Sequence, residues 1–116
     1  MKLRRGDVML VLFPNSDLQT AKRRPALVLQ RDGLSSGLSQ VIIAMISSNL
    51  ARRGHASRVF ISRDSAAGRN AGLRLDSVVM TDNLATVLET ELDSKLGSLP
   101  EMSAVNAALK HTLALA

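Results

Sequence analysis

Three consecutive cations, Lys22, Arg23 and Arg24, stand immediately before Pro25 and the apolar run that it opens. A guanidinium presents a planar fork of hydrogen-bond donors that matches the oxygens of a phosphate group. A basic run before a strand is also a common form of solvated edge, so the run alone is a weak indication of a site. A defined polar neighbour is needed to turn it into a phosphate-binding site.

The strand register predicts such a neighbour. The apolar runs Pro25–Gln30 and Gln40–Ser47 form a predicted hairpin around a polar loop. If Arg31 pairs with the first residue of the second run, the constant register of an antiparallel ladder places Arg24 opposite Ser47. Directly opposed residues share a face and have Cβ atoms about 5 Å apart, although a bulge changes the pairing. We therefore expect Arg24 and Ser47 to be neighbours at one end of the sheet.

A second group of cations follows the predicted hairpin. Arg52, Arg53 and Arg58 lie in and after a segment predicted to be a mobile loop. We expect them to hold a nucleic-acid backbone, with affinity that falls with salt by a slope of about −0.7 per contact for single strands. His55 in the same segment is an alternative general base at neutral pH, although an exposed, non-catalytic histidine is the commoner case.

The elements that must position these residues are mostly strands. Short apolar runs bounded by Gly, Pro, Asn, Asp or Ser predict them. The predicted strands are Asp7–Phe13, Pro25–Gln30, Gln40–Ser47, Arg58–Ile61 and Leu73–Thr81, and Thr86 and Val87 start another short one. Both aromatic residues, Phe13 and Phe60, lie in these runs, where core packing is the default, so base stacking is expected to be limited.

The end of the chain changes to a helical pattern. Ser98 and Glu101 have the spacing of a capping box, and apolar residues then recur at 102, 105, 109 and 113. This periodicity predicts one apolar helix face. Residues 1–116 are therefore expected to form a single, mainly β domain with a C-terminal helix.

Charge is distributed unevenly along the 116 residues. Residues 1–74 carry 13 Lys/Arg against 4 Asp/Glu, whereas residues 75–116 carry 2 against 6. A basic body attracts polyanions, which favours a nucleic-acid partner. With no cysteine, two distant histidines and scattered carboxylates, no metal site and no cofactor are expected. The apolar runs are too short to cross a membrane, so a cytoplasmic protein is expected.

Six segments, spread over nearly the whole chain, resemble one known family. They are Arg4–Val8 with the following Phe13-Pro14, Lys22–Leu29, Ile46–Ser48, Asp76–Val79 continuing to Asp82, Thr86-Val87 and Leu96–Leu99. In this order they look like the MazF/PemK toxins. The resemblance implies an SH3-like small β-barrel with a C-terminal α-helix (CcdB/PemK-like), a homodimer and a cognate inhibitory antitoxin protein. It also implies sequence-selective, metal-independent cleavage of single-stranded RNA, such as messenger RNA.

Residue by residue, the resemblance assigns roles to this chain. The family's catalytic arginine falls on Arg24, its catalytic hydroxyl on Ser47, and an acid used as a base in one branch on Asp82. Substrate-binding roles are expected for Asn15, Lys22, Arg23, Ser48, Arg52, Arg53 and Arg58. The chain departs from that branch at Met80, where the branch has an arginine, and from the family at Ala85, where an arginine is common, and in the loop 15–20. These departures bear on the branch of the family, on the identity of the general base and on the RNA sequence that is cut.

The chemistry expected of this set is attack of an RNA 2′-OH on the adjacent phosphorus, which expels the 5′-oxygen. Arg24 would stabilise charge on the phosphate and Ser47 would hold one of its oxygens. Two alternatives stay open on the same fold, a non-catalytic toxin of the gyrase-poisoning CcdB type and a basic RNA-binding barrel. Neither alternative needs the phosphate chemistry of the Arg24–Ser47 pair.

Overall fold

The computed structural model describes residues 2–15 and 17–116, so Ser16 of the polar loop lies outside the described residues. The elements, in chain order, are β1 (Asp7–Pro14), β2 (Ala21–Val28), β3 (Gln40–Ser47), the 3₁₀ turn η1 (Leu50–Arg52), β4 (Arg58–Ile61), α1 (Ala66–Asn70), β5 (Ser77–Leu88), the 3₁₀ turn η2 (Glu89–Glu91), β6 (Leu92–Ser98) and α2 (Ser103–Leu113).

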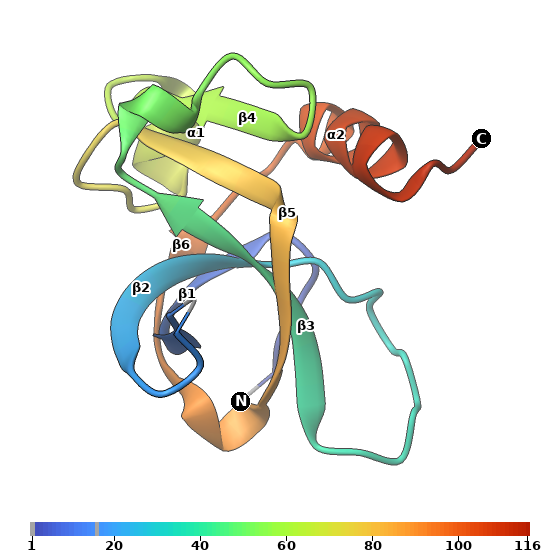
Figure 1. Ribbon diagram of the computed structural model, residues 1–116. Helices are drawn as coiled ribbons and strands as arrows, with labels where there is room; N and C mark the ends of the chain where they lie inside the picture. The colour runs from blue at the N-terminus through green and yellow to red at the C-terminus, as the bar shows by residue number, and fades with distance from the viewer. Residues whose placement is uncertain (1, 16) are drawn as a thin grey trace.

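The six strands form one antiparallel sheet in the order β4-β5-β3-β2-β1-β6. The sheet curls, and α2 lies at one end of the molecule beside β4 and β5 (Figure 1). The mainly β class with a C-terminal helix is confirmed. The expected closure into a barrel is corrected, because β4 and β6 are the two ends of the strand order and do not pair with each other in the described chain.

Side chains from the two faces of the sheet enter two core clusters, as the alternation of a pleated strand requires. Along β3, Ile43 and Met45 enter one cluster, whereas Ala44 and Ile46 enter the other. The helix α2 covers the second cluster with Val105, which is fully buried. The apolar face predicted for this helix is therefore the face that packs on the sheet.

Two strands match their predicted bounds, β1 is one residue longer, and two are shifted, since β2 ends at Val28 and β5 begins only at Ser77. The structure has β3 and β4 at the predicted residues. Strand β2 begins at Ala21 because the polar residues before Pro25 pair with β1. Strand β5 continues to Leu88 because an irregularity in its pairing with β3 lets the ladder resume after Asp82.

The predicted capping box is wrong. Ser98 ends β6, and its hydroxyl donates to Oδ1 of Asp7 at 3.1 Å. Asp7 is only 3% exposed, and its carboxylate also accepts from the backbone N–H of Arg4 and pairs with Lys95, so the Ser98 hydroxyl is one of three groups that stabilise this buried charge. The helix begins at Ser103, whose backbone N–H donates to Oε1 of Glu101 at 2.8 Å.

Phe60 also departs from its expected burial. Phe13 is buried in the core, as predicted, but the side chain of Phe60 is 44% exposed. Strand β4 lies at an edge of the sheet, so the face that carries Phe60 is covered only in part.

Candidate functional site

The pairing between β2 and β3 is short, and the sheet opens where it stops. Only the pairs Ala26–Met45, Leu27–Ala44 and Val28–Ile43 are recorded, and all three have the predicted register. Before Ala26, β2 follows β1, while the last residues of β3 follow β5. The two strands therefore separate, so Arg24 does not pair with Ser47 as predicted but with Val11 of β1, and a cavity of about 610 Å³ lies at the separation.

Arg24 and Ser47 both line this cavity, as do most of the predicted substrate-binding residues. The lining includes Lys22, Arg23, Arg24, Ser47, Ser48, Asn49, Arg52, Gly72, Arg74, Ser77 and Leu96. Five of these are cations, and no Asp or Glu is found among the described residues that line the cavity. Such a site attracts a phosphate backbone.

Arg24 is held at one nitrogen and open at another. Its Nη2 donates to Oδ1 of Asn15 at 2.9 Å. Its Nε is buried and has no hydrogen-bond partner among the described residues. A buried donor without a partner is costly, so a ligand that offers an anionic oxygen there would be bound favourably.

The loop between β1 and β2 fixes Asn15. Its Nδ2 donates to Oγ1 of Thr20 at 2.9 Å. The carboxylate of Asp17 accepts from the backbone N–H groups of Thr20 and Gln19, and these hydrogen bonds lower the pKa of Asp17. Asn15, which was expected to bind substrate, is not a lining residue of the cavity and contacts Arg24 instead.

Ser47 stands at the end of β3, and its side chain is nearly buried. Its Oγ accepts a hydrogen bond from the backbone N–H of Asn49 at 3.1 Å. This bond leaves the O–H proton of Ser47 for an acceptor, and none is recorded within the described part of the chain. Ser48 follows it and is exposed at the rim of the cavity.

Asp82 and Arg58 form an ion pair outside this cavity. Nη2 of Arg58 donates to Oδ2 of Asp82 at 2.9 Å, and its Nη1 donates to the carbonyl oxygen of Arg52 at 3.1 Å. The hydrogen bond from Arg58 holds the pKa of Asp82 below its ordinary value of 3.8. Arg58 is therefore engaged in fixing η1, and neither residue lines the cavity.

Arg53 and His55 also lie outside the cavity lining. The guanidinium of Arg53 stands over the ring of Phe60, 5.9 Å from its centroid. Nδ1 of His55 accepts from the backbone N–H of Ser57 at 3.1 Å, and its ring is 6.2 Å from that of His111.

Sequence reasoning missed three polar lining residues, Asn49, Arg74 and Ser77. Arg74 was placed inside a predicted strand, but the residues before Ser77 form a loop. The sequence signal for this loop was the glycine at position 72, which adopts a φ of +71° that favours glycine. A Cβ at Gly72 would stand 2.1 Å from the carbonyl oxygen of Leu96, so this loop packs directly on β6 and forms a wall of the cavity.

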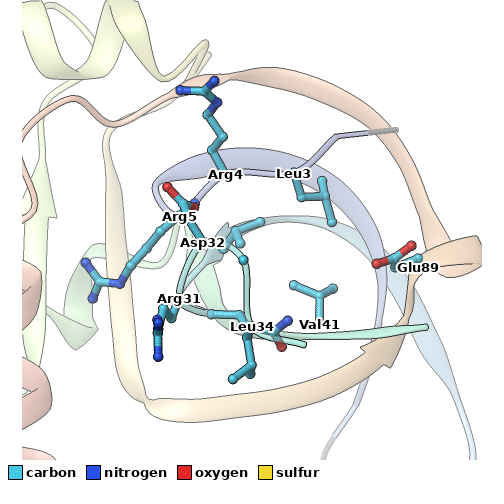
Figure 2. Close-up of a pocket in the computed structure, with 11 residues that line it drawn as sticks. Leu3, Arg4, Arg5, Arg31, Asp32, Leu34, Val41 and Glu89 are labelled. Atoms are coloured by element: carbon cyan, nitrogen blue, oxygen red, sulfur yellow. The ribbon is translucent and has the colours of Figure 1, made fainter. Parts of the chain in front are cut away.

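A second, smaller hollow of about 150 Å³ lies near the N-terminal segment. Figure 2 shows Arg4 and Arg5 extending away from its centre, with Glu89 at its rim. The side chain of Arg5 donates to the carbonyl oxygen of Leu29 and to Asn106, so its charge serves the packing of α2. The larger cavity is therefore the better candidate for chemistry.

Two further features bear on the function of the described residues. No three His, Cys, Asp or Glu side chains gather there around a possible metal position. No helix in the described part of the chain is long and apolar enough to cross a membrane.

Comparison with known proteins gives a consistent result. Residues 4–113 match the family described as "PemK-like, MazF-like toxin of type II toxin-antitoxin system". The chain is 36% identical over 107 residues to "Endoribonuclease MazF6" of Mycobacterium tuberculosis, with 90% of each chain covered.

Solved structures agree with this result. "Mycobacterium tuberculosis toxin MazF-mt6" is 26% identical, with a TM-score of 0.74 over 95% of this chain and 98% of that one. An "Endoribonuclease in complex with its cognate antitoxin from Mycobacterial species" has the same fold, with 21% identity, a TM-score of 0.74 and coverage of 98% and 97%. The matched residues span both the cavity and the helix that closes the fold, and the chain belongs to the PemK-like, MazF-like toxin family of type II toxin–antitoxin systems.

Proposed function

We propose that this chain is an endoribonuclease toxin that cleaves single-stranded RNA sequence-selectively and without a metal ion. A cognate antitoxin inhibits it. The observation that carries the proposal is the buried Nε of Arg24, which has no partner among the described residues and lies in a cation-lined cavity that also contains Ser47. The endoribonuclease named among its 36% identical relatives supports the same activity.

The proposed reaction is an internal transesterification of RNA. The 2′-oxygen forms a bond to the adjacent phosphorus as the bond from phosphorus to the 5′-oxygen breaks. One proton leaves the 2′-OH and one reaches the departing 5′-oxygen, so the products are a 2′,3′-cyclic phosphate and a 5′-OH. Most of the acceleration comes from positioning the phosphate and stabilising its developing charge.

Arg24 and Ser47 supply these two effects. Nε of Arg24 donates to a phosphate oxygen that carries more charge in the transition state than in the ground state. The free O–H of Ser47 donates to a second oxygen, because its lone pair already accepts from Asn49. Lys22, Arg23 and Arg52 bind neighbouring phosphates, and Ser48 contacts the strand at the rim.

The reaction also needs a general base that takes the proton of the 2′-OH. Asp82 keeps the base role predicted for it as a candidate. The ion pair with Arg58 lowers the pKa of Asp82 and so makes it a weaker base. The kcat and the RNA affinity of Asp82→Asn separate a catalytic role of Asp82 from a positioning role.

A homodimer in the cytoplasm is part of the proposal. Several large apolar side chains of β3 and β5 are exposed, among them Ile42 at 38% and Leu88 at 54%. A second subunit that covers such side chains removes apolar surface from water. The antitoxin is proposed to compete with RNA for the cation-lined cavity.

The experiment is an RNA cleavage assay in EDTA with a mixed RNA pool and mapping of the new ends. The wild type is expected to cut at a short recurring sequence. Arg24→Ala is expected to cut at least about 100-fold more slowly, the cost of removing one donor to the transition-state charge. Arg31→Ala removes an exposed cation outside the cavity and serves as the matched control.

Cleavage by Arg24→Ala at the wild-type rate contradicts the proposal. So does a wild type that arrests growth without cutting RNA, the result expected of a non-catalytic toxin on the same fold.

A further inference from the structure

Phe60 lies in the same transverse row of the sheet as Ser47. Ser47 pairs with Val78 between β3 and β5, and Val78 pairs with Phe60 between β5 and β4. Directly opposed residues project from the same face of a sheet. Phe60 and Ser47 therefore share a face and stand two strand spacings, or about 10 Å, apart.

The ring of Phe60 is not required by either core cluster. It is 44% exposed on the edge strand β4, and neither cluster includes it. Its neighbours Val59 and Ile61 point to the opposite face and pack in the cluster beneath α2. An exposed aromatic side chain beside a cation-lined cavity is a surface that a ligand can use.

The turn η1 connects the cavity to this ring. Leu50 packs on the core cluster that contains Val78, and Val78 is the residue that pairs with both Ser47 and Phe60. Arg52 lines the cavity, and the next residue, Arg53, holds its guanidinium over Phe60. Two consecutive arginines of this segment therefore reach the cavity and the ring.

The ion pair of Arg58 and Asp82 keeps this turn in place. Arg58 donates to the carbonyl oxygen of Arg52, so β4 and η1 are joined directly. Asp82 is the carboxylate in this pair, and Arg58 balances its charge. Because Arg58 balances the charge of Asp82, this carboxylate does not repel a polyanion that binds near Phe60.

We propose that Phe60 and Arg53 form a platform on which one unpaired base of the bound RNA stacks, outside the nucleotides at the cut phosphate. This inference rests on the proposed function and names a further contact of the same RNA strand. Bases of single strands stack on aromatic rings and on guanidinium planes. Because Arg53 already covers one face of the Phe60 ring, the base stacks on the outer face of the guanidinium, which the ring holds in position.

The test uses an RNA that carries a 2′-deoxy nucleotide at the mapped cut position, so that it binds without being cut. 2-Aminopurine is placed at successive positions on both sides, because stacking quenches its fluorescence. One position outside the cut site is expected to be quenched by the wild type. Phe60→Leu, which keeps an apolar side chain without a π-face, is expected to restore the fluorescence there.

Binding affinity provides the second readout. Phe60→Leu is expected to weaken binding of the longer RNA by about 10-fold. It is expected to bind an oligonucleotide too short to reach the platform as tightly as the wild type does. Arg53→Lys keeps the charge but loses the planar face, so it should lose the quenching. Leu38→Ala, at an exposed leucine of the loop before β3, is the matched control.

Failure of this inference and failure of the proposed function give different results. If the wild type cuts RNA and Phe60→Leu binds every RNA as tightly as the wild type, the platform proposal is overturned and the cleavage site stands. A protein partner then becomes the occupant of the Phe60 surface. If the wild type neither binds nor cuts RNA, both proposals are overturned.

Discussion

Within the described residues, the side chain of Arg24 has one recorded hydrogen-bond partner, Asn15, which fixes the orientation of the guanidinium. Nη2 is bound to Asn15, while the buried Nε has no partner among the described residues. Asn15 was expected to bind substrate, yet its contact with Arg24 makes it a positioning residue. Its effect should then appear in the rate of the chemical step rather than in binding.

Asn15→Ala tests this role at the residue scale. The change frees the guanidinium to move, and small displacements of a catalytic group are costly, so kcat should fall by about 10-fold or more. KM should change by less than about twofold, because the cations that bind the backbone stay in place. Steady-state cleavage of a short RNA measures both constants.

Asn15→Asp supplies the control for that measurement. It keeps an oxygen that accepts from Nη2, so it should recover part of the lost kcat. A higher KM with an unchanged kcat for Asn15→Ala would instead assign Asn15 to substrate binding, as the sequence suggested.

At the scale of elements, η1 is a short turn whose position depends on the ion pair beneath it. Arg58 links Asp82 of β5 to the carbonyl oxygen of Arg52. The pair is partly exposed, with side-chain exposures of 25% and 32%. It is therefore expected to contribute modestly to stability but directly to the placement of Arg52 and Arg53.

Asp82→Asn should lower the free energy of unfolding by about 1 kcal/mol at pH 7. Because the folded-state pKa of Asp82 lies below its ordinary value of 3.8, the contribution is present above pH 3.8 and is lost as pH falls through the lower folded value. Urea unfolding at pH 7 and at pH 3 measures the difference between the two proteins, which should shrink at pH 3.

The same variant resolves the role of Asp82 in cleavage. A positioning role predicts weaker RNA binding with a pH–rate profile like that of the wild type. A loss of kcat of about 100-fold or more, with RNA affinity unchanged, would assign the general base to Asp82.

Some elements were predictable from local pattern and others were not. The continuous apolar run Gln40–Ser47 predicts a strand, and its hairpin with the run from Pro25 has the predicted register at three pairs. The presence of Arg24 and Ser47 at the same end of the sheet therefore followed from the sequence. Strand β6 was missed because only Leu92 is buried within it, which leaves no period of two to read. The short helix α1 was missed because its five residues give too little pattern for a helical period.

The exposed ring of Phe60 could not be predicted either. An aromatic residue in a short apolar run has the same local pattern at an edge strand as in a core strand. Only the strand order, which places β4 at the end of the sheet, exposes it. The position of Arg74 depends on tertiary structure too. Gly72 indicated a loop, but only the packing of this loop on β6 places Arg74 in the cavity.

At the scale of the whole molecule, the uneven charge of the sequence becomes a cation-lined cavity. All five cations of its lining come from residues 22–74, the basic part of the chain. None of the acidic residues of the C-terminal third lines the cavity in the described structure, although Asp93 pairs with the lining residue Arg23. Affinity for RNA should therefore depend strongly on salt.

Arg74→Gln tests this account with a residue that the sequence did not identify. The slope of log affinity against log salt should become shallower by about 0.7, the value for one phosphate contact on a single strand. The slope is measured by fluorescence anisotropy with the uncleavable RNA, at salt concentrations from about 50 to about 200 mM. Arg31→Gln should leave the slope unchanged, and equal slopes for all three proteins contradict the assignment of Arg74 to the site.

The central claim is that this cavity cuts RNA through the RNA's own 2′-OH. It is tested most directly with two otherwise identical RNA strands, one of which has a single 2′-deoxy nucleotide at the mapped cut position. In EDTA, the all-ribose strand should be cut to a 2′,3′-cyclic phosphate and a 5′-OH, and the substituted strand should stay intact while binding with similar affinity. Cleavage of the substituted strand at the same position and rate would contradict the account.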